Sequence, residues 1–154
     1  MLTQVGKKSG AADRAADEED NTMENVWKYK IELKDSEAFS KVEKLRGIHI
    51  PEELKNFIKE HNAAQPSKYH FMVDSIERVF GAVLSFDEEE KEADKVYPAL
   101  EAIGNKNLLP FAVDPFGNFI CYALDKNEVV FWDHETEDVT STGKNLKQFI
   151  ENLY

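Results

Sequence analysis

Hydrophobic residues recur along this chain with two different spacings, which predict helices in some stretches and strands in others. Apolar residues at positions i, i+3, i+4 and i+7 lie on one face of a helix. This spacing follows Pro51 and predicts a helix over 51–62, with Pro51 in its first position and Asn62 ending it in a left-handed conformation. The face of that helix comprises Leu54, Phe57, Ile58 and His61.

Three other segments repeat the helical period. A helix is predicted over 36–46, capped by Ser36 and ended by Gly47. Its apolar side comprises Phe39, Val42 and Leu45. Two later helices are predicted over 96–103 and 145–154, each with an apolar face.

Strand-like segments, rich in β-branched and aromatic residues, fill most of the remaining chain. They lie at 69–72, 79–84, 109–113, 119–124 and 128–132, with a short strand around 138–140. Several are apolar on both faces, so the sheet should be covered on both sides, at least in part. The order of elements predicts a single α+β domain with an antiparallel-rich sheet of about five or six strands and about four helices.

The first part of the chain differs in composition from the rest. Residues 1–22 contain few large apolar side chains and end in an acidic run, so burial could not offset the entropy of ordering them. We predict a disordered N-terminal extension over 1–22 and a folded domain over 23–154. Met23 is an alternative natural start. The length of 154 residues fits one domain better than two.

The net charge of the chain limits which classes of binding partner are expected. The chain has 30 acidic and 19 basic residues and a formal net charge of −11. Affinity for nucleic acid comes largely from neutralising phosphates, and anionic membranes also attract basic residues. We therefore expect neither as a partner and favour a basic protein, because opposite charge speeds association. The alternative is that acidity only maintains solubility.

The sequence contains no signal for export or for a membrane span. No run of 18 apolar residues occurs, and no apolar segment follows Lys7 and Lys8 as it would in a signal peptide. We therefore expect the protein to stay in the cytoplasm.

Candidates for catalysis are weak. The single cysteine, Cys121, lies among apolar residues and is expected to be a buried, inert thiol. The run 132–135 includes Asp133, His134 and Glu135, which resemble an acid–base or metal cluster. On a strand His134 would point away from the two carboxylates, so we favour a strand end whose polar residues begin a turn. We expect no enzyme activity, no cofactor and no metal.

Two acidic segments are candidates for binding a basic partner. The first is the run 87–94, and the second begins after the strand that ends at Trp132, which is either a packing residue or an interface anchor. The candidate partner-binding residues are Asp87, Glu88, Glu89, Glu90, Glu92, Asp94, Trp132, Asp133 and Glu135. The alternative for the run 87–94 is a solvated loop leading into a helix whose dipole favours acidic residues.

Three motifs, in order, resemble those of the SUKH superfamily, also called the cell-wall assembly regulator and killer-toxin-resistance family. The first is Ile50-Pro51-x-x-Leu54-x-x-Phe57-Ile58-x-x-x-Asn62. The second is Leu109-Pro110-Phe111-Ala112-x-Asp114-x-x-Gly117-Asn118, and the third is Val129-Val130-Phe131-Trp132-Asp133-His134-Glu135. The resemblance covers about residues 36–154. It departs after Asn62, where Ala63 stands in place of the family's glycine, and over 63–80.

This resemblance implies an α+β domain in a family not known for catalysis. Many bacterial members resemble immunity proteins, which bind and neutralise secreted toxins, often nucleases, while eukaryotic members are regulatory scaffolds. The first hypothesis is therefore an immunity protein that binds a basic, nuclease-type toxin domain stoichiometrically. The alternatives are a regulatory binding module without a toxin target and, less favoured, a hydrolase or metal enzyme using Asp133 and His134.

Overall fold

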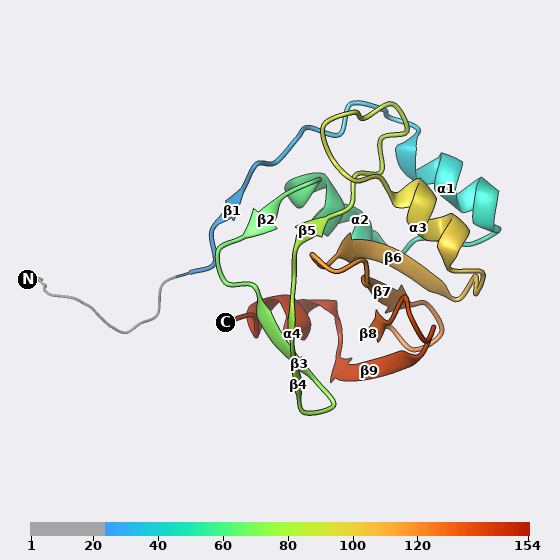
Figure 1. The fold of residues 1–154 in the computed structure, drawn as a ribbon. Helices are drawn as coiled ribbons and strands as arrows, with labels where there is room; N and C mark the ends of the chain where they lie inside the picture. Colours follow the sequence, from blue (N-terminus) through green and yellow to red (C-terminus); the bar gives the residue numbers. More distant parts are fainter. Residues whose placement is uncertain (1–23) are drawn as a thin grey trace, which may run out of the picture.

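The computed structural model describes residues 24–154, and the extension predicted over 1–22 lies outside the described residues. The helices are α1 (Ala38–Arg46), α2 (Glu52–His61), α3 (Val96–Ala102) and α4 (Leu146–Glu151). The strands are β1 (Trp27–Lys28), β2 (Gln65–Pro66), β3 (His70–Val73), β4 (Ile76–Val79), β5 (Ala82–Val83), β6 (Leu108–Val113), β7 (Phe119–Ala123), β8 (Glu128–Trp132) and β9 (Val139–Lys144). Helices and strands occur in groups along the chain, with β2 to β5 and β6 to β9 each forming an uninterrupted run of strands, as Figure 1 shows.

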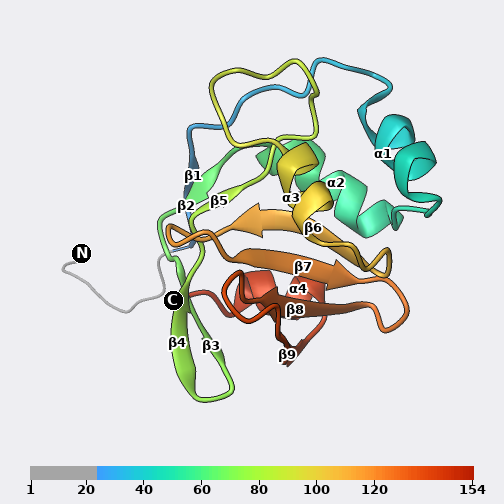
Figure 2. The ribbon, with the colours of Figure 1, turned by 45° about the vertical axis from the view of Figure 1, so that its right-hand side comes forward.

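A five-stranded antiparallel sheet forms the centre of the domain. Its strand order is β5-β6-β7-β8-β9, so each strand pairs with its neighbour in sequence (Figure 2). Two additional two-stranded sheets pair β1 with β2 and β3 with β4. The predicted α+β class, the antiparallel sheet and the four helices are confirmed for the described residues.

Strands β6, β7 and β8 are apolar on both faces of the sheet: successive residues point to opposite faces, and both sets are buried. On β7, Tyr122 belongs to the main core, which all four helices help to build. Its neighbour Cys121 belongs to a second, smaller cluster on the other face. That cluster comprises Ile103, Leu108, Cys121, Ala123, Val130 and Trp132, with Phe119 packed against it.

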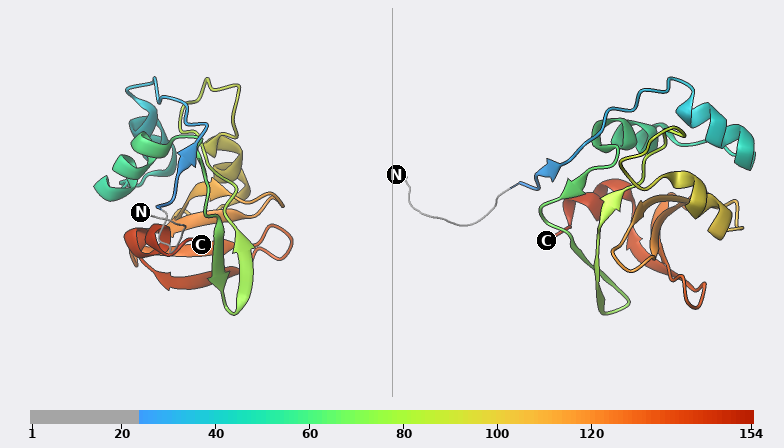
Figure 3. Two further views of the ribbon diagram at one scale, coloured as in Figure 1. Left: turned by 90° about the vertical axis from the view of Figure 1, so that its left-hand side faces the viewer. Right: turned by 45° about the horizontal axis from the view of Figure 1, so that its top comes forward.

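The strand predicted over 69–72 corresponds to β3, but its hairpin with β4 was not predicted. The two-residue turn of this hairpin, Asp74 and Ser75, has φ angles of 49° and 66°. Such turns usually contain glycine, which adopts positive φ without strain, and this one does not. Asp and Ser favour turns, but without the glycine typical of two-residue hairpins the pairing of β3 with β4 was missed. Figure 3 shows that the hairpin projects beyond the central sheet.

Two details of α1 differ from the prediction. The residue before the helix is Glu37 rather than Ser36, and the Glu37 amide donates to Asp35 Oδ1 at 2.9 Å. Leu45 is 60% exposed, whereas Arg46 is only 7% exposed. A long cationic side chain can bury its stem while its head finds hydrogen-bond acceptors, which periodicity alone does not reveal.

The end of α2 also differs from the prediction. Asn62 has φ of −54°, and the left-handed conformation falls on Ala63 instead, with φ of 65°. The amide side chain of Asn62 is fully buried and bonds to groups outside the helix, so the residue has a structural role other than ending it. By contrast, Gly47 ends α1 in the predicted left-handed conformation, with φ of 66°.

Candidate protein-binding surface

The acidic run predicted as a docking surface forms a loop that leaves and rejoins the edge of the sheet at one point. We call residues 86–94 the acidic loop; Figure 1 shows it as the extended loop between β5 and α3. At its base, the Ser85 amide donates to the Asp94 carbonyl, and the Val96 amide donates to the Ser85 carbonyl, both at 2.8 Å. The two ends of the loop are therefore held together by backbone hydrogen bonds.

A buried polar network joins this base to the end of α2 and to the segment that contains Ile31. The Asn62 side chain donates to the Ile31 carbonyl at 2.9 Å and to Ser85 Oγ at 3.2 Å. It also accepts a hydrogen bond from the Phe86 amide at 3.2 Å. Asn62, Ser85 and Phe86 are all fully buried. The loop therefore starts from a packed position, although most of its carboxylates lie at the surface.

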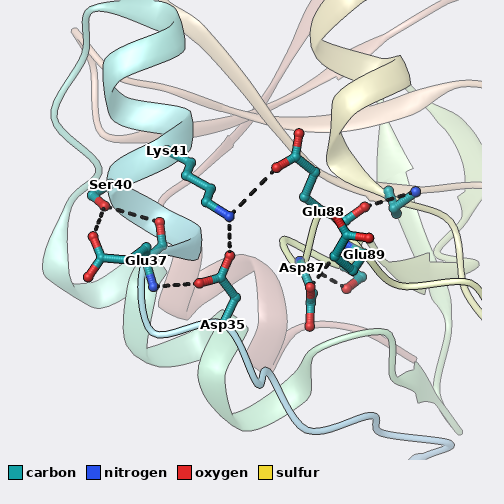
Figure 4. A network of polar contacts seen from close by, with 9 residues as sticks. Asp35, Glu37, Ser40, Lys41, Asp87, Glu88 and Glu89 are labelled. Carbon is teal, nitrogen blue, oxygen red and sulfur yellow. Dashed lines mark hydrogen bonds and ion pairs between the residues drawn. The ribbon is translucent and has the colours of Figure 1, made fainter.

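Two of the predicted carboxylates help to build the loop. Asp87 is 7% exposed and accepts a hydrogen bond from the Glu89 amide at 3.1 Å. Glu88 forms an ion pair of 3.6 Å with Lys41 on α1, which also bonds to Asp35 at 2.7 Å (Figure 4). The hydrogen bond from Lys41 holds the pKa of Asp35 below its ordinary value. This network joins the acidic loop to the start of α1.

The other carboxylates of the loop differ in their freedom to meet a partner. Glu90 accepts hydrogen bonds from the Glu92 and Lys91 amides, at 2.8 and 3.1 Å. The carboxylates of Glu89, Glu92 and Asp94 have no hydrogen bond or ion pair with any other residue between 24 and 154, and all three residues are exposed. These three are therefore the acidic groups best placed to pair with a cation from another protein.

A surface hollow of about 480 Å³ lies beside the acidic loop and includes two of these carboxylates, Glu92 and Asp94, in its wall. Tyr29 lines it too and is 71% exposed, the highest value among the large hydrophobic residues that are exposed. The backbone of Tyr29 has a φ of 66°, which is uncommon outside glycine. Lys91 is the only basic residue among those that line the hollow within the described chain.

The second acidic segment forms the turn between β8 and β9. Asp133 Oδ1 accepts hydrogen bonds from the Glu135 amide at 2.8 Å and the Thr136 amide at 3.3 Å. The hydrogen bond from the Glu135 amide is the main cause of the lowered pKa of Asp133. The His134 ring lies 2.7 Å from Asn118 Oδ1, in the neighbouring turn. These residues therefore build a turn, as the favoured interpretation of the run 132–135 predicts.

The structure does not bring the two acidic segments together. The acidic loop follows β5 at one edge of the sheet, whereas the 133–138 turn joins β8 to the opposite edge strand, β9. Neighbouring strands lie about 4.8 Å apart, so roughly 14 Å or more of sheet separates the two attachment points. Trp132 is 7% exposed and stacks on Phe119 with ring centroids 5.7 Å apart. Its burial makes Trp132 a packing residue rather than an exposed anchor.

Sequence reasoning missed Tyr29 as part of a candidate site. It stands in a short strand-like segment among charged residues, and nothing in that pattern indicates a positive φ or a neighbouring acidic wall. Its proximity to Glu92 and Asp94 depends on how the chain returns through β2 and β5. Among the described residues, no group of three or more His, Cys, Asp or Glu side chains could hold a metal ion.

These observations define an α+β domain, built around a five-stranded antiparallel sheet, that presents a structured acidic loop. A family model described as SUKH_6, SMI1-KNR4 cell-wall, matches residues 36–150, and the chain belongs to this family within the SUKH superfamily. Comparison with curated proteins found no match. Within the described residues, no helix is both long enough and apolar enough to cross a membrane.

Proposed function

We propose that this protein is an immunity protein that binds and neutralises a cognate toxin, a basic nuclease-type domain, by forming a stoichiometric complex. The family is consistent with such a role. The observation that carries the proposal is the acidic loop, whose base is buried while Glu89, Glu92 and Asp94 stay exposed. A preformed acidic surface of this kind gives up little conformational entropy on binding.

The hollow beside the loop suggests how the partner is held. An Arg or Lys side chain from the toxin would enter it, pair with Glu92 and Asp94, and place its cation against the Tyr29 ring. Charge-assisted hydrogen bonds are stronger than neutral ones, and a cation over an aromatic face contributes about 0.5–1 kcal/mol at exposed sites. In this proposal Tyr29 supplies the aromatic anchor.

A second candidate function is a regulatory binding module without a toxin target. The cell-wall description of the matching family model favours it. The two functions predict different neighbouring genes. An immunity protein requires a toxin gene close to its own, and the product of that gene inhibits growth. Relief of that inhibition by this protein would distinguish the two.

The proposal also holds that the protein acts without catalysis. Its basis is that His134 and Asp133 are engaged in the hydrogen bonds of two turns. We expect the purified protein to hydrolyse no substrate in a panel of nucleotides, esters and peptides. Turnover that disappears in a His134→Ala variant would contradict this expectation.

The binding surface is tested by reversing charges in each acidic segment separately. We expect Glu89→Lys/Glu92→Lys to slow association with the toxin and to flatten its salt dependence, because exposed charges act mainly on the association rate. The matched control is Glu135→Lys/Glu137→Lys, which makes the same charge change in the other segment. The measurement is the association rate at low and high salt. Equal effects of the two variants would reject the acidic loop as the contact surface.

A further inference from the structure

The last turn of α1 and one side of α3 enclose a groove of about 580 Å³. Much of its wall is apolar, and it includes Leu45, which is 60% exposed, and Pro98, which is also exposed. The described residues that line it are Leu45, Arg46, Lys95, Tyr97, Pro98, Leu100, Glu101 and Lys106. We call this feature the α1–α3 groove; Arg46, the last residue of α1, donates a hydrogen bond to the Leu100 carbonyl of α3.

The charge of this groove is opposite to that of the chain. Three of its lining residues are cations, Arg46, Lys95 and Lys106, and one is an acid, Glu101. The chain as a whole carries a formal charge of −11. A positive site in such a protein would select an anionic group and would disfavour a cationic one.

Arg46 provides a buried part of this positive charge. It is 7% exposed, and its guanidinium donates to the Leu100 carbonyl at 2.7 Å and the Asn105 carbonyl at 2.9 Å. Burial lowers the pKa of Arg46, but an arginine side chain stays charged in proteins. Within residues 24–154, its Nε has no hydrogen-bond partner and no carboxylate forms an ion pair with it. Among the described residues, its guanidinium is therefore compensated by two carbonyl dipoles, one in α3 and one just after it.

The groove adjoins the acidic loop. Lys95 lines the groove and follows the last residue of the loop, and its ammonium donates to the Glu88 carbonyl at 3.0 Å. The positive, partly apolar groove is therefore adjacent to the negative loop. A partner complementary to both would need an acidic residue next to its basic region.

We propose that the α1–α3 groove receives a segment of the partner protein in which an Asp or Glu side chain stands between aliphatic residues. The carboxylate would lie toward Arg46 and Lys106, and the aliphatic side chains would contact Leu45 and Pro98. This inference rests on the proposed function, because it treats the groove as the specificity-determining part of the same interface. Reversed charge at one point of an interface excludes partners that are only generally basic.

The chemistry of the groove can be tested without the partner. The ¹⁵N-labelled protein is titrated by NMR with the peptide Ac-Leu-Asp-Leu-NH₂ and, separately, with Ac-Leu-Lys-Leu-NH₂. We expect only the aspartyl peptide to shift the amide signals of Leu45, Tyr97 and Glu101. The Lys106→Glu variant should weaken that binding by about two- to fivefold, as expected for one exposed ion pair. The control Lys147→Glu, on exposed α4 surface, should leave it unchanged.

Two results would overturn the inference. They are equal shifts with both peptides and shifts that map outside the groove. Concentration-dependent shifts of the same signals without peptide would instead assign the groove to a second copy of the chain.

The peptide titration can fail independently of the tests of the immunity function. If the aspartyl peptide fails but the acidic-loop variant still slows toxin association, only the groove is rejected. If the peptide binds and no neighbouring toxin is neutralised, the immunity role is rejected.

Discussion

At the scale of single residues, Asn62 shows how one buried side chain can hold a surface loop in place. Its amide bonds at once to Ile31, Ser85 and Phe86, which belong to two separate segments of the chain. Removing one partner leaves the others buried without hydrogen bonds, which costs more than the bonds themselves contribute. Asn62 therefore couples the stability of the domain to the position of the acidic loop.

We predict that Asn62→Ala lowers the free energy of unfolding by about 1–3 kcal/mol, because buried donors and acceptors lose their partners. The measurement is urea unfolding followed by circular dichroism. Asn56→Ala on the exposed face of α2 is the control and should change little. A stability loss no greater than that of the control would show that the network contributes nothing.

Cys121 provides a second residue-scale prediction. It is fully buried, and burial raises the pKa of its thiol, so the reactive thiolate is scarce. We predict that iodoacetamide labels it, by mass spectrometry, only under unfolding conditions and not in the native state at pH 7 or 9. Rapid labelling of the native protein would contradict the packing of the second core cluster.

At the scale of elements, Glu43 connects α1 to the segment that starts α2. Its carboxylate accepts a hydrogen bond from the Ile50 amide at 2.9 Å and pairs with Lys55 at 3.3 Å. The bond from Ile50 is the largest cause that lowers the pKa of Glu43 below its ordinary value of 4.5. A carboxyl group whose pKa is lower in the folded than in the unfolded state stabilises the native state at pH values above the unfolded pKa. This stabilisation is lost as the pH falls through the folded-state pKa.

We therefore predict that the protein loses stability as pH falls below about 4.5, through the lowered pKa of Glu43. Glu43→Gln keeps an acceptor for the Ile50 amide but has no charge to titrate, so its stability should fall less over the same range. Denaturant unfolding at several pH values between neutrality and acid provides the test, with Glu60→Gln on exposed α2 surface as control. Parallel curves for all three proteins would contradict the assigned role of Glu43.

Elements with regular periodicity were predictable from the sequence, whereas positive φ angles at non-glycine residues and long-range side-chain contacts were not. The face of Leu54 and Ile58 repeats at helical spacing because it packs on the core, and β6 to β8 are apolar because both faces of the sheet are covered. The β3–β4 turn has no glycine to signal it. The burial of Arg46 depends on the carbonyl groups of Leu100 and Asn105, which lie 54 and 59 residues further along the chain.

At the scale of the whole molecule, the topology decides which acidic segments can act together. The sequence identifies two such segments, but only the strand order places them at opposite edges of the sheet. It also places the acidic loop next to Tyr29 on one side and the α1–α3 groove on the other. The candidate surface could thus be predicted in its charge and location along the chain, but not in its shape.

The most direct test of the central claim is neutralisation in cells. A toxin domain encoded beside this gene is expressed under an inducible promoter, together with this protein or a variant, and growth is measured. The account predicts that the wild-type protein and Glu135→Lys/Glu137→Lys restore growth, whereas Glu89→Lys/Glu92→Lys restores it only at higher expression. Failure of the wild-type protein to protect against any neighbouring toxin, or full protection by the acidic-loop variant at equal expression, would contradict the account.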